Sequence, residues 1–152
     1  MLWITPVAAD LETVMTASEA AIAQRAVSVG TPDRTPEIIA NLIAEIRGMI
    51  ATWGPNTISA DPTKIPPSFK ARFLVLARGR VLTGLPGYAQ SEERKAEAAA
   101  AEAWLLLVAK GTIRPEPADD AIPNTVPTEN PSRVQVVSAP GSRTGRDRMN
   151  GI

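Results

Sequence analysis

Cysteine and histidine are both absent from this sequence of 152 residues. Their absence excludes disulfide bonds, thiolate nucleophiles and the commonest zinc ligands, and it removes the one side chain that titrates near neutral pH unaided. Most catalytic arrangements are therefore closed to the chain, and we expect it to be no enzyme and to hold no cofactor or metal. A chain without cysteine also carries no sign of an oxidising compartment.

An excess of charge is missing as well. The 16 Lys and Arg balance the 16 Asp and Glu, so no net field draws the chain onto nucleic acid or an anionic membrane, and protein partners are favoured. The longest apolar stretch, Ala103 to Ala109, is far shorter than the roughly 20 residues that cross a bilayer. The opening MLWITPVAAD lacks the basic start and apolar run of a signal peptide. We therefore expect no membrane partner and a soluble protein made in the cytoplasm.

Prolines and glycines, 14 and 10 in number, separate four helical patterns. Before Gly30 lies one broken helix or two, with a capping box of Thr16 and Glu19. The second pattern opens with Thr35 as the expected N-cap and Pro36 at the first helical position. It is the clearest amphipathic helix, because its apolar residues recur at spacings of three and four. These residues are Ile39, Leu42, Ile43, Ile46, Met49, Ile50 and Trp53.

A proline-rich loop over residues 54–67 precedes the third pattern. Ile58 and Ile65 in this loop are expected to tuck under the core. The third helix is predicted over residues 67–83, with an apolar side and several arginines round the rest.

The fourth helix is predicted from the N-cap Ser91 to Lys110, with Gly111 as its C-terminal cap. Alanine occupies nearly every face of its middle, which lets a neighbouring helix approach its backbone closely. Trp53 and Trp104 lie on apolar helix faces, and we expect both in the core.

Composition changes at Thr112, beyond which the chain is rich in proline and has no aromatic residue. Such a segment cannot build a core of its own. The sequence therefore predicts a helical core over residues 1–111 and an extended, proline-rich C-terminal arm over residues 112–152. The stretch SRVQVVSA alternates like a strand that pairs with an edge of another chain. The predicted fold class is mainly α: a small bundle of four to five helices, a long extended C-terminal arm and one short β strand.

Two acidic clusters are candidates for a divalent cation. On the fourth helix the carboxylates are interleaved with Arg94 and Lys95, which favours a solvated helix face over a metal site. The second cluster lies in a proline-rich stretch, where a rigid cage is hard to build, so we interpret it as solubilising charge. The clusters are Glu92, Glu93, Glu97 and Glu102, and Asp119 and Asp120.

Arg72, Arg78 and Arg80 on the third helix could touch DNA. They spread round the helix axis and no aromatic residues interleave with them, so structural or inter-subunit ion pairs are favoured. A helix-turn-helix regulator within residues 35–83 is a rival from another class, but that motif needs a turn of about 3 or 4 residues. The ending GSRTGRDRMNGI lacks the lysine and the strand and helix context of a phosphate-binding loop, and docking on protein is favoured.

Trp3 allows two interpretations. With Leu2 and Ile4 on either side, it forms either an N-terminal anchor for another molecule or a plug for the helical core. The plug is favoured.

A family resemblance spans nearly the whole chain. The opening WITPVAADLETVMTASEAAIAQRA resembles the start of small head-tail connector proteins of tailed bacteriophages, also called adaptor or head-completion proteins, including the Mu-like group. PEIIANLIAEIRGMIA, IPPSFKARFLVLARGRVLTGLP and SEERKAEAAAAEAWLLLVAKG follow in the order and spacing of that family. The ending SRTGRDRMNGI is similar to its basic C-terminal signature. That signature usually has an aromatic residue before the Arg-Asp and another at the end, where Gly145 and Ile152 stand here.

The resemblance implies a virion protein of the phage neck, at the head-tail interface, made in the bacterial host cytoplasm. Its partners would be further copies of itself in a ring, twelve in the family's usual arrangement, then the portal protein above and a tail or stopper protein below. DNA would pass through the channel without sequence-specific binding. Stopper and tail-terminator rings are rivals within the same class, but they are typically rich in β structure.

Partner contacts to the portal or a neighbouring subunit are expected on the arm. Its valines would supply the apolar side of a paired strand, and its arginines would meet acidic surface. The expected contact residues are Val134, Val136, Arg143, Arg146, Arg148, Met149 and Ile152.

Overall fold

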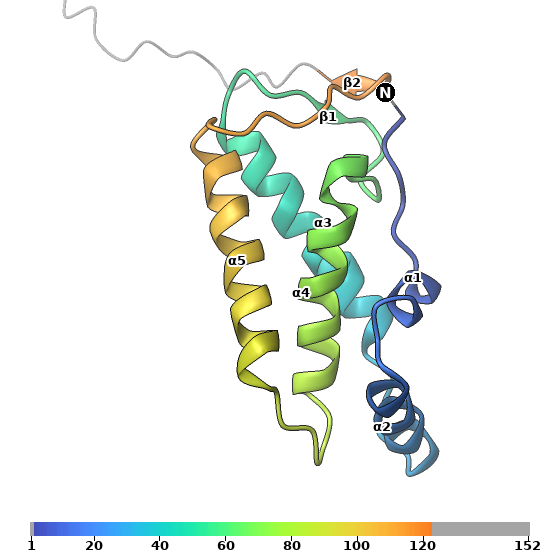
Figure 1. Ribbon diagram of the computed structural model, residues 1–152. Helices are drawn as coiled ribbons and strands as arrows, with labels where there is room; N and C mark the ends of the chain where they lie inside the picture. The colour runs from blue at the N-terminus through green and yellow to red at the C-terminus, as the bar shows by residue number, and fades with distance from the viewer. Residues whose placement is uncertain (1, 123–152) are drawn as a thin grey trace, which may run out of the picture.

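The computed structural model describes residues 2–122, and this part of the chain is mainly helical, which confirms the predicted fold class. Five α helices and one 3-10 helix are separated by short loops and by a longer connection between the third and fourth (Figure 1). The helices are α1 (Ala8–Glu12), α2 (Ala17–Ser28), α3 (Thr35–Thr52), η1 (Pro67–Phe69), α4 (Lys70–Thr83) and α5 (Glu92–Ala109), and the strands are β1 (Ile58–Ser59) and β2 (Ala121–Ile122).

α3, α4 and α5 pack along one another and form the bundle, with α1 and α2 on the flank of the bundle away from α5 (Figure 1). The apolar stripe of α3 explains its place, because residues three and four apart fall on one side of a helix and face the other two helices. Leu42, Ile46 and Ile50 are completely buried, and Phe69 and Phe73 from η1 and α4 complete the centre of the core.

The helix ends follow the local chemistry of the chain. Thr16 Oγ1 accepts a hydrogen bond from Glu19 N and Glu19 Oε2 accepts one from Thr16 N, so the predicted capping box is confirmed and the first pattern is two helices. Gly30 and Gly111, with φ of 89° and 75°, end α2 and α5. At both ends the N–H of the glycine and of the residue after it return to the last turn, so Gly111 is the cap that was predicted.

The start of α3 differs from the prediction. Thr35 is the first helical residue rather than the N-cap, which is Arg34 and makes no capping bond. The side chain of Asp33 accepts the hydrogen bond from Thr35 N at 2.9 Å instead. An aspartate readily accepts a hydrogen bond from the main-chain N–H two residues later. The threonine-proline pair resembled an N-cap followed by proline, so the sequence did not indicate the role of Asp33.

Trp53 and Trp104 are only half-buried, so the prediction that both lie in the core was wrong. Trp104 packs edge-on against Phe69, with ring centroids 4.7 Å apart, and its outer face carries the guanidinium of Arg72 at 4.0 Å. Trp53 ends α3 and covers the turn at Gly111. An indole at the end of a helix covers the rim of a core as readily as it fills the centre.

Residues 113–122 do not leave the bundle at the point where the composition changes. They cross one end of it, with Ala118 buried, and β2 pairs antiparallel with β1 in the register Ile58 to Ile122 and Ser59 to Ala121. We call residues 113–122 the strap. The two short strands do not alter the helical class, and Ile65, which is completely buried, reaches the core as predicted.

Candidate interaction surfaces

The arm residues expected to bind partners lie outside the described part of the chain. This applies to Val134, Val136, Arg143, Arg146, Arg148, Met149 and Ile152. What the structure does describe is the first part of the predicted arm, residues 112–122, together with the outer faces of the bundle.

At the N-terminus, Trp3 is a core residue, 4% exposed, which confirms the plug interpretation. Its Nε1 donates a hydrogen bond of 2.9 Å to the carbonyl oxygen of Glu116 in the strap, so one indole joins the first and the last described segments. Ile4 exchanges two main-chain hydrogen bonds of 2.9 Å with Ile65. Of the three residues considered as an anchor, only Leu2 is free to contact another molecule, with 73% of its surface exposed.

Arg47 of α3 fixes the loop beneath the strap. Its two terminal nitrogens donate to the carbonyl oxygens of Lys64 and Ser59, at 2.9 and 2.7 Å. Burial lowers the pKa of Arg47, an effect that Asp61 and Asp120 oppose. The guanidinium also lies 5.8 Å from the centre of the Trp3 ring.

Asp120 is a structural residue and not merely a solubilising one, which corrects the interpretation from sequence. The hydroxyl of the completely buried Ser59 donates to Asp120 Oδ2 at 2.8 Å, and Ala60 N donates to the Asp120 carbonyl at 3.1 Å. The Ser59 hydrogen bond holds the pKa of Asp120 below its usual value, because it stabilises the ionised form. Ser68 donates to the carboxylate of Glu116 at 2.6 Å. The strap is therefore held at Trp3, Ser68 and β1.

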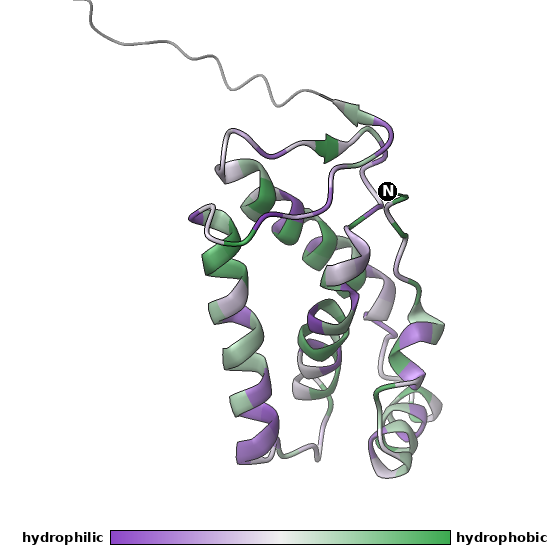
Figure 2. Cartoon of the chain, turned by 45° about the horizontal axis from the view of Figure 1, so that its top comes forward, coloured by the Kyte–Doolittle hydropathy of each residue, from purple (hydrophilic) through white to green (hydrophobic). Residues whose placement is uncertain are grey.

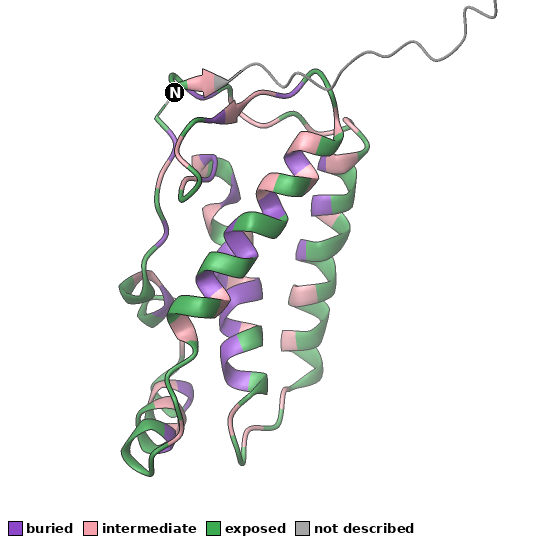
Figure 3. Ribbon diagram, turned by 180° about the vertical axis from the view of Figure 1, so that it is seen from behind, coloured by how far each residue is buried: buried purple, intermediate pink, exposed green. Residues whose placement is uncertain are grey.

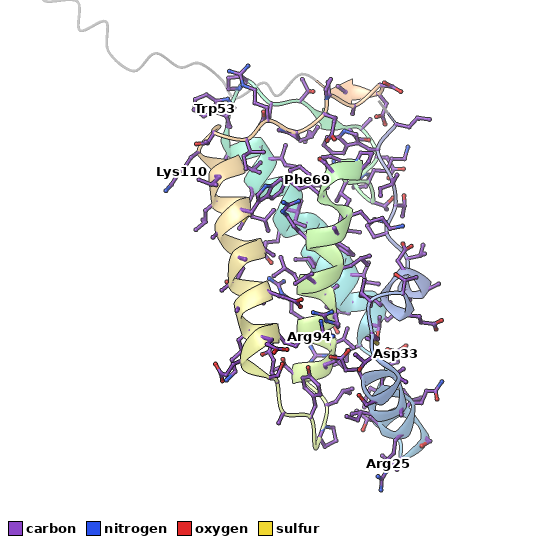
Figure 4. All side chains as sticks on the ribbon, in the orientation of Figure 1. Arg25, Asp33, Trp53, Phe69, Arg94 and Lys110 are labelled. Carbon is purple, nitrogen blue, oxygen red and sulfur yellow. The ribbon has the colours of Figure 1, made fainter. Side chains whose placement is uncertain are left out.

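A second polar cluster joins α5 to α4 and α2. Arg78, only 5% exposed, donates to the carbonyl of Val14 at 3.0 Å and to Glu97 at 2.6 Å. Arg94 contacts the same Glu97 oxygen at 3.0 Å and Glu19 at 3.4 Å (Figure 4). Hydrogen bonds from Arg94 and then Arg78 lower the pKa of Glu97. The network ties α2, which otherwise packs lightly, to the bundle.

The arginines of α4 form intrachain contacts, as the structural interpretation of these residues predicted. Arg78 pairs with Glu97, Arg80 pairs with Glu45 at 2.7 Å, and Arg72 stacks on Trp104. Glu97 consequently differs from the solvated carboxylate that the sequence indicated. Over residues 2–122, no group of Asp, Glu, His or Cys side chains is placed to hold a metal ion.

A small apolar cleft of about 90 Å³ lies between α2, the start of α3 and the end of α4. Ala23, Val27 and Ile38 supply much of its lining, and Arg80 and Asp33 stand at its polar side. The volume is well below the roughly 300 Å³ at which small-molecule sites begin. This cleft marks light packing of α2 rather than a ligand site.

The outward face of α5 is an apolar surface that the other helices leave uncovered. Leu106 and Leu107 are 53% and 41% exposed, and the alanines before them on this face are exposed too. The alanine-rich middle of α5 was expected to let a neighbouring helix approach its backbone closely. Only Ala101 is buried against the bundle, with Ala98 partly so, because most of the run points away from α3 and α4 (Figure 3).

Sequence reasoning missed three residues that hold these surfaces together: Glu116, Asp120 and Glu97. The spacing of Arg94 and Glu97 was a usable signal, because residues three apart on a helix meet. Glu116 and Asp120 bond to residues about 50 to 110 positions away in sequence, and no local pattern reports such pairs.

None of the helices within residues 2–122 has the length and apolar character needed to span a membrane. Compared with known protein families, with curated proteins and with solved structures, the chain gives no match.

Proposed function

We propose that this chain is a head-tail adaptor of a tailed bacteriophage, which assembles into a ring beneath the portal, extends the DNA channel and offers a platform to the tail. The sequence resemblance, in four ordered stretches and a basic ending, supports this proposal. The partners would be further copies of the chain, twelve to a ring as the resemblance implies, the portal protein, and a tail or stopper protein.

The observation that carries the proposal is the strap. Residues 113–122 are fixed across one end of the bundle by Trp3, Ser68 and β1, so residues 123–152 start from a defined point beside the N-terminus (Figure 1). A binding segment that starts from a fixed point on a folded unit acts at a high effective concentration on any partner within reach. Many such weak contacts, repeated round a ring, sum to a stable assembly.

Three further features favour an adaptor over its rivals. The described chain is mainly helical, whereas stopper and terminator rings are typically rich in β structure. The connection between α3 and α4 contains β1 and η1, unlike the short turn of a helix-turn-helix regulator. Arg78 and Arg80, which a DNA reader would use, are occupied by Glu97 and Glu45.

The experiment is to package capsids with the chain truncated after Ile122. We expect a folded helical unit, because the core and the strap lie within residues 2–122, and we expect filled heads that lack tails or leak DNA. A matched control carries residues 123–152 in scrambled order, so that length and composition stay constant. Failure of both variants supports docking by a specific segment.

Normal tail joining and full DNA retention with the truncated chain would overturn the proposal. Normal function of the scrambled chain alone would show that residues 123–152 are a passive spacer, which contradicts a docking role for Val134, Val136 and the arginines.

A further inference from the structure

The uncovered face of α5 forms one continuous stripe. Ala101, Leu105 and Val108 face the bundle, and residues at spacings of three and four on the opposite side of the helix are exposed. Leu106 and Leu107 in the last turn are 53% and 41% exposed, so a good part of each large apolar side chain stays in contact with water, which is unfavourable. The stripe consists of Ala96, Ala99, Ala100, Ala103, Leu106 and Leu107.

Side-chain size and charge both change from one end of the stripe to the other. Its first part is alanine and its last turn is leucine, so the helix runs from polar to apolar along its length (Figure 2). Glu92 and Glu93 stand at its start, where Arg94 and Lys95 also lie but pair with Glu97 and Glu92 of the same chain, and Lys110 caps its end. Small and acidic features therefore lie at one end, and large and basic features lie at the other.

We propose that α5 packs antiparallel against α5 of a second copy of this chain, with the two-fold axis at Ala103. In this register Leu106 lies over Ala100 of the second copy, and Leu107 lies over Ala99. A two-fold contact needs a surface that complements itself, and a stripe whose size and charge both reverse from end to end does so only in the antiparallel orientation.

Packing and charge act in the same direction in this pair. Ala103 at the crossing point lets the two backbones approach, and the leucines fill the space that the alanines leave. Lys110 of one copy lies opposite Ala96 of the other, about one helical turn from Glu92 and Glu93. Lys110 has no ion pair within residues 2–122, and the side chain of Glu92 is 88% exposed although it contacts Lys95. The antiparallel helix dipoles add a small favourable contribution.

The contact is small, because it uses one face of one helix. We therefore expect a reversible dimer with a dissociation constant on the order of 10–100 µM, in the range of transient interfaces. The proposal concerns the isolated chain and does not depend on the adaptor function, so its test needs no capsid or portal.

Cysteine scanning tests the register, because the chain has no native cysteine. Ala103→Cys places the two thiols at the two-fold axis, and we expect a disulfide-linked dimer under mild oxidation. Ala96→Cys is the matched control on the same stripe. In the antiparallel pair its two thiols lie about 21 Å apart along the helices, since 14 residues separate position 96 from the position opposite it and each rises about 1.5 Å. A parallel pair would cross-link both variants.

Charge exchange tests the partner. One variant carries Glu92→Lys with Glu93→Lys, and the other carries Lys110→Glu. In a dimer of either variant, like charges face each other across the two-fold axis. We expect the dissociation constant of that dimer to rise by about tenfold or more at low salt. Mixing the two variants places opposite charges at both ends and should restore association. Sedimentation velocity of full-length chains measures all three samples, and circular dichroism shows whether each variant is folded.

Three results would overturn the proposal: a wild-type chain that stays monomeric up to about 500 µM, well above the expected dissociation constant; equal cross-linking at positions 96 and 103; or a mixture of the charge variants that associates no better than either alone. Failure of the adaptor proposal would leave all three measurements unaffected, so the two proposals are separable.

Discussion

At the residue scale, the indole of Trp3 connects the N-terminus, α3 and the strap. Its ring is buried, its Nε1 binds the Glu116 carbonyl, and Arg47 lies over one of its faces. Replacing Trp3 with Ala should lower the free energy of unfolding by about 3–5 kcal/mol, because the change leaves a cavity and an unpaired carbonyl. Urea denaturation of the full chain measures the loss.

Two variants control this prediction. Leu2→Ala changes an exposed side chain next to Trp3 and should stay within about 0.5 kcal/mol of the wild type. Trp3→Phe keeps a smaller aromatic ring but removes the hydrogen-bond donor. It should therefore cost less stability than Trp3→Ala, because the phenyl ring retains most of the packing that alanine loses. Equal stability of Trp3→Ala and Leu2→Ala would place Trp3 on a surface.

Asp120 gives the strap a dependence on pH. The Ser59 hydroxyl lowers the pKa of Asp120 in the folded chain, so the carboxylate favours folding above its unfolded pKa of about 3.9, and this contribution is lost as the pH falls through the lower folded value. Ser59→Ala removes the donor and should raise the pKa of Asp120 towards its ordinary range. Carboxyl NMR titration of both chains tests this, and an unchanged Asp120 titration in Ser59→Ala would contradict it.

Single residues show where sequence reasoning succeeds and where it stops. Thr16, Ser91 and Gly111 were assigned correctly because capping depends on residues within one turn. Trp3 was placed in the core because a large apolar side chain beside a helical unit tends to be buried. The partner of its indole nitrogen was not predictable, since Glu116 offers a main-chain carbonyl that any residue would supply.

At the element scale, the glycine after α5 is more constrained than the glycine after α2. Both have positive φ, but a Cβ at Gly111 would clash with the ring of Trp53, whereas one at Gly30 would meet open space. Gly30→Ala should therefore lower stability by about 1 kcal/mol through its backbone alone, and Gly111→Ala by about 2 kcal/mol or more. Thermal melts of the two variants measure the difference.

Gly48 supplies the opposite control. It lies inside α3 with negative φ and no atom near the position of a Cβ, so Gly48→Ala should raise stability by roughly 0.5–1 kcal/mol. If Gly111→Ala lowered the thermal stability no more than Gly30→Ala, the contact between Trp53 and the end of α5 would not contribute to stability. That outcome would contradict the packing described for Trp53.

The elements themselves were largely predictable, because α3 and α4 repeat apolar residues at helical spacing and prolines or glycines lie between them. The strap was not. Its composition indicates a segment without a core of its own, and that is correct, yet a short extended chain can pair with a loop and borrow the core beneath it. The composition of a segment indicates only whether it can fold alone, whereas β2 depends on pairing with β1.

At the scale of the whole molecule, the proposed α5 pair and the proposed ring differ in symmetry. Neighbours in a polar ring under a portal are related by rotation about the channel, and no two-fold axis lies between them. The antiparallel α5 contact would then belong to the free chain and open during assembly. A weak contact suits that role, because a dimer with a dissociation constant of about 10–100 µM dissociates readily.

The final prediction concerns the three arginines of the arm, Arg143, Arg146 and Arg148. If residues 123–152 dock on acidic surface of the portal or of a neighbouring subunit, reversing all three charges to Glu should weaken binding to the purified portal ring by about tenfold or more at low salt. The wild-type affinity should itself fall as salt is added, since exposed charges are screened beyond about 8–10 Å at physiological ionic strength.

Arg25→Glu is the matched control for this experiment. Arg25 is an exposed arginine on α2, at the end of the folded unit opposite the strap (Figure 4), so its reversal changes the net charge without altering residues 123–152. If the loss of portal affinity per reversed charge were the same in Arg25→Glu and in the triple variant, the effect would come from net charge and not from a specific contact. A loss confined to the triple variant, with the helical core intact by circular dichroism, would locate the docking chemistry in the basic ending, even though Gly145 and Ile152 replace the aromatic residues usual there.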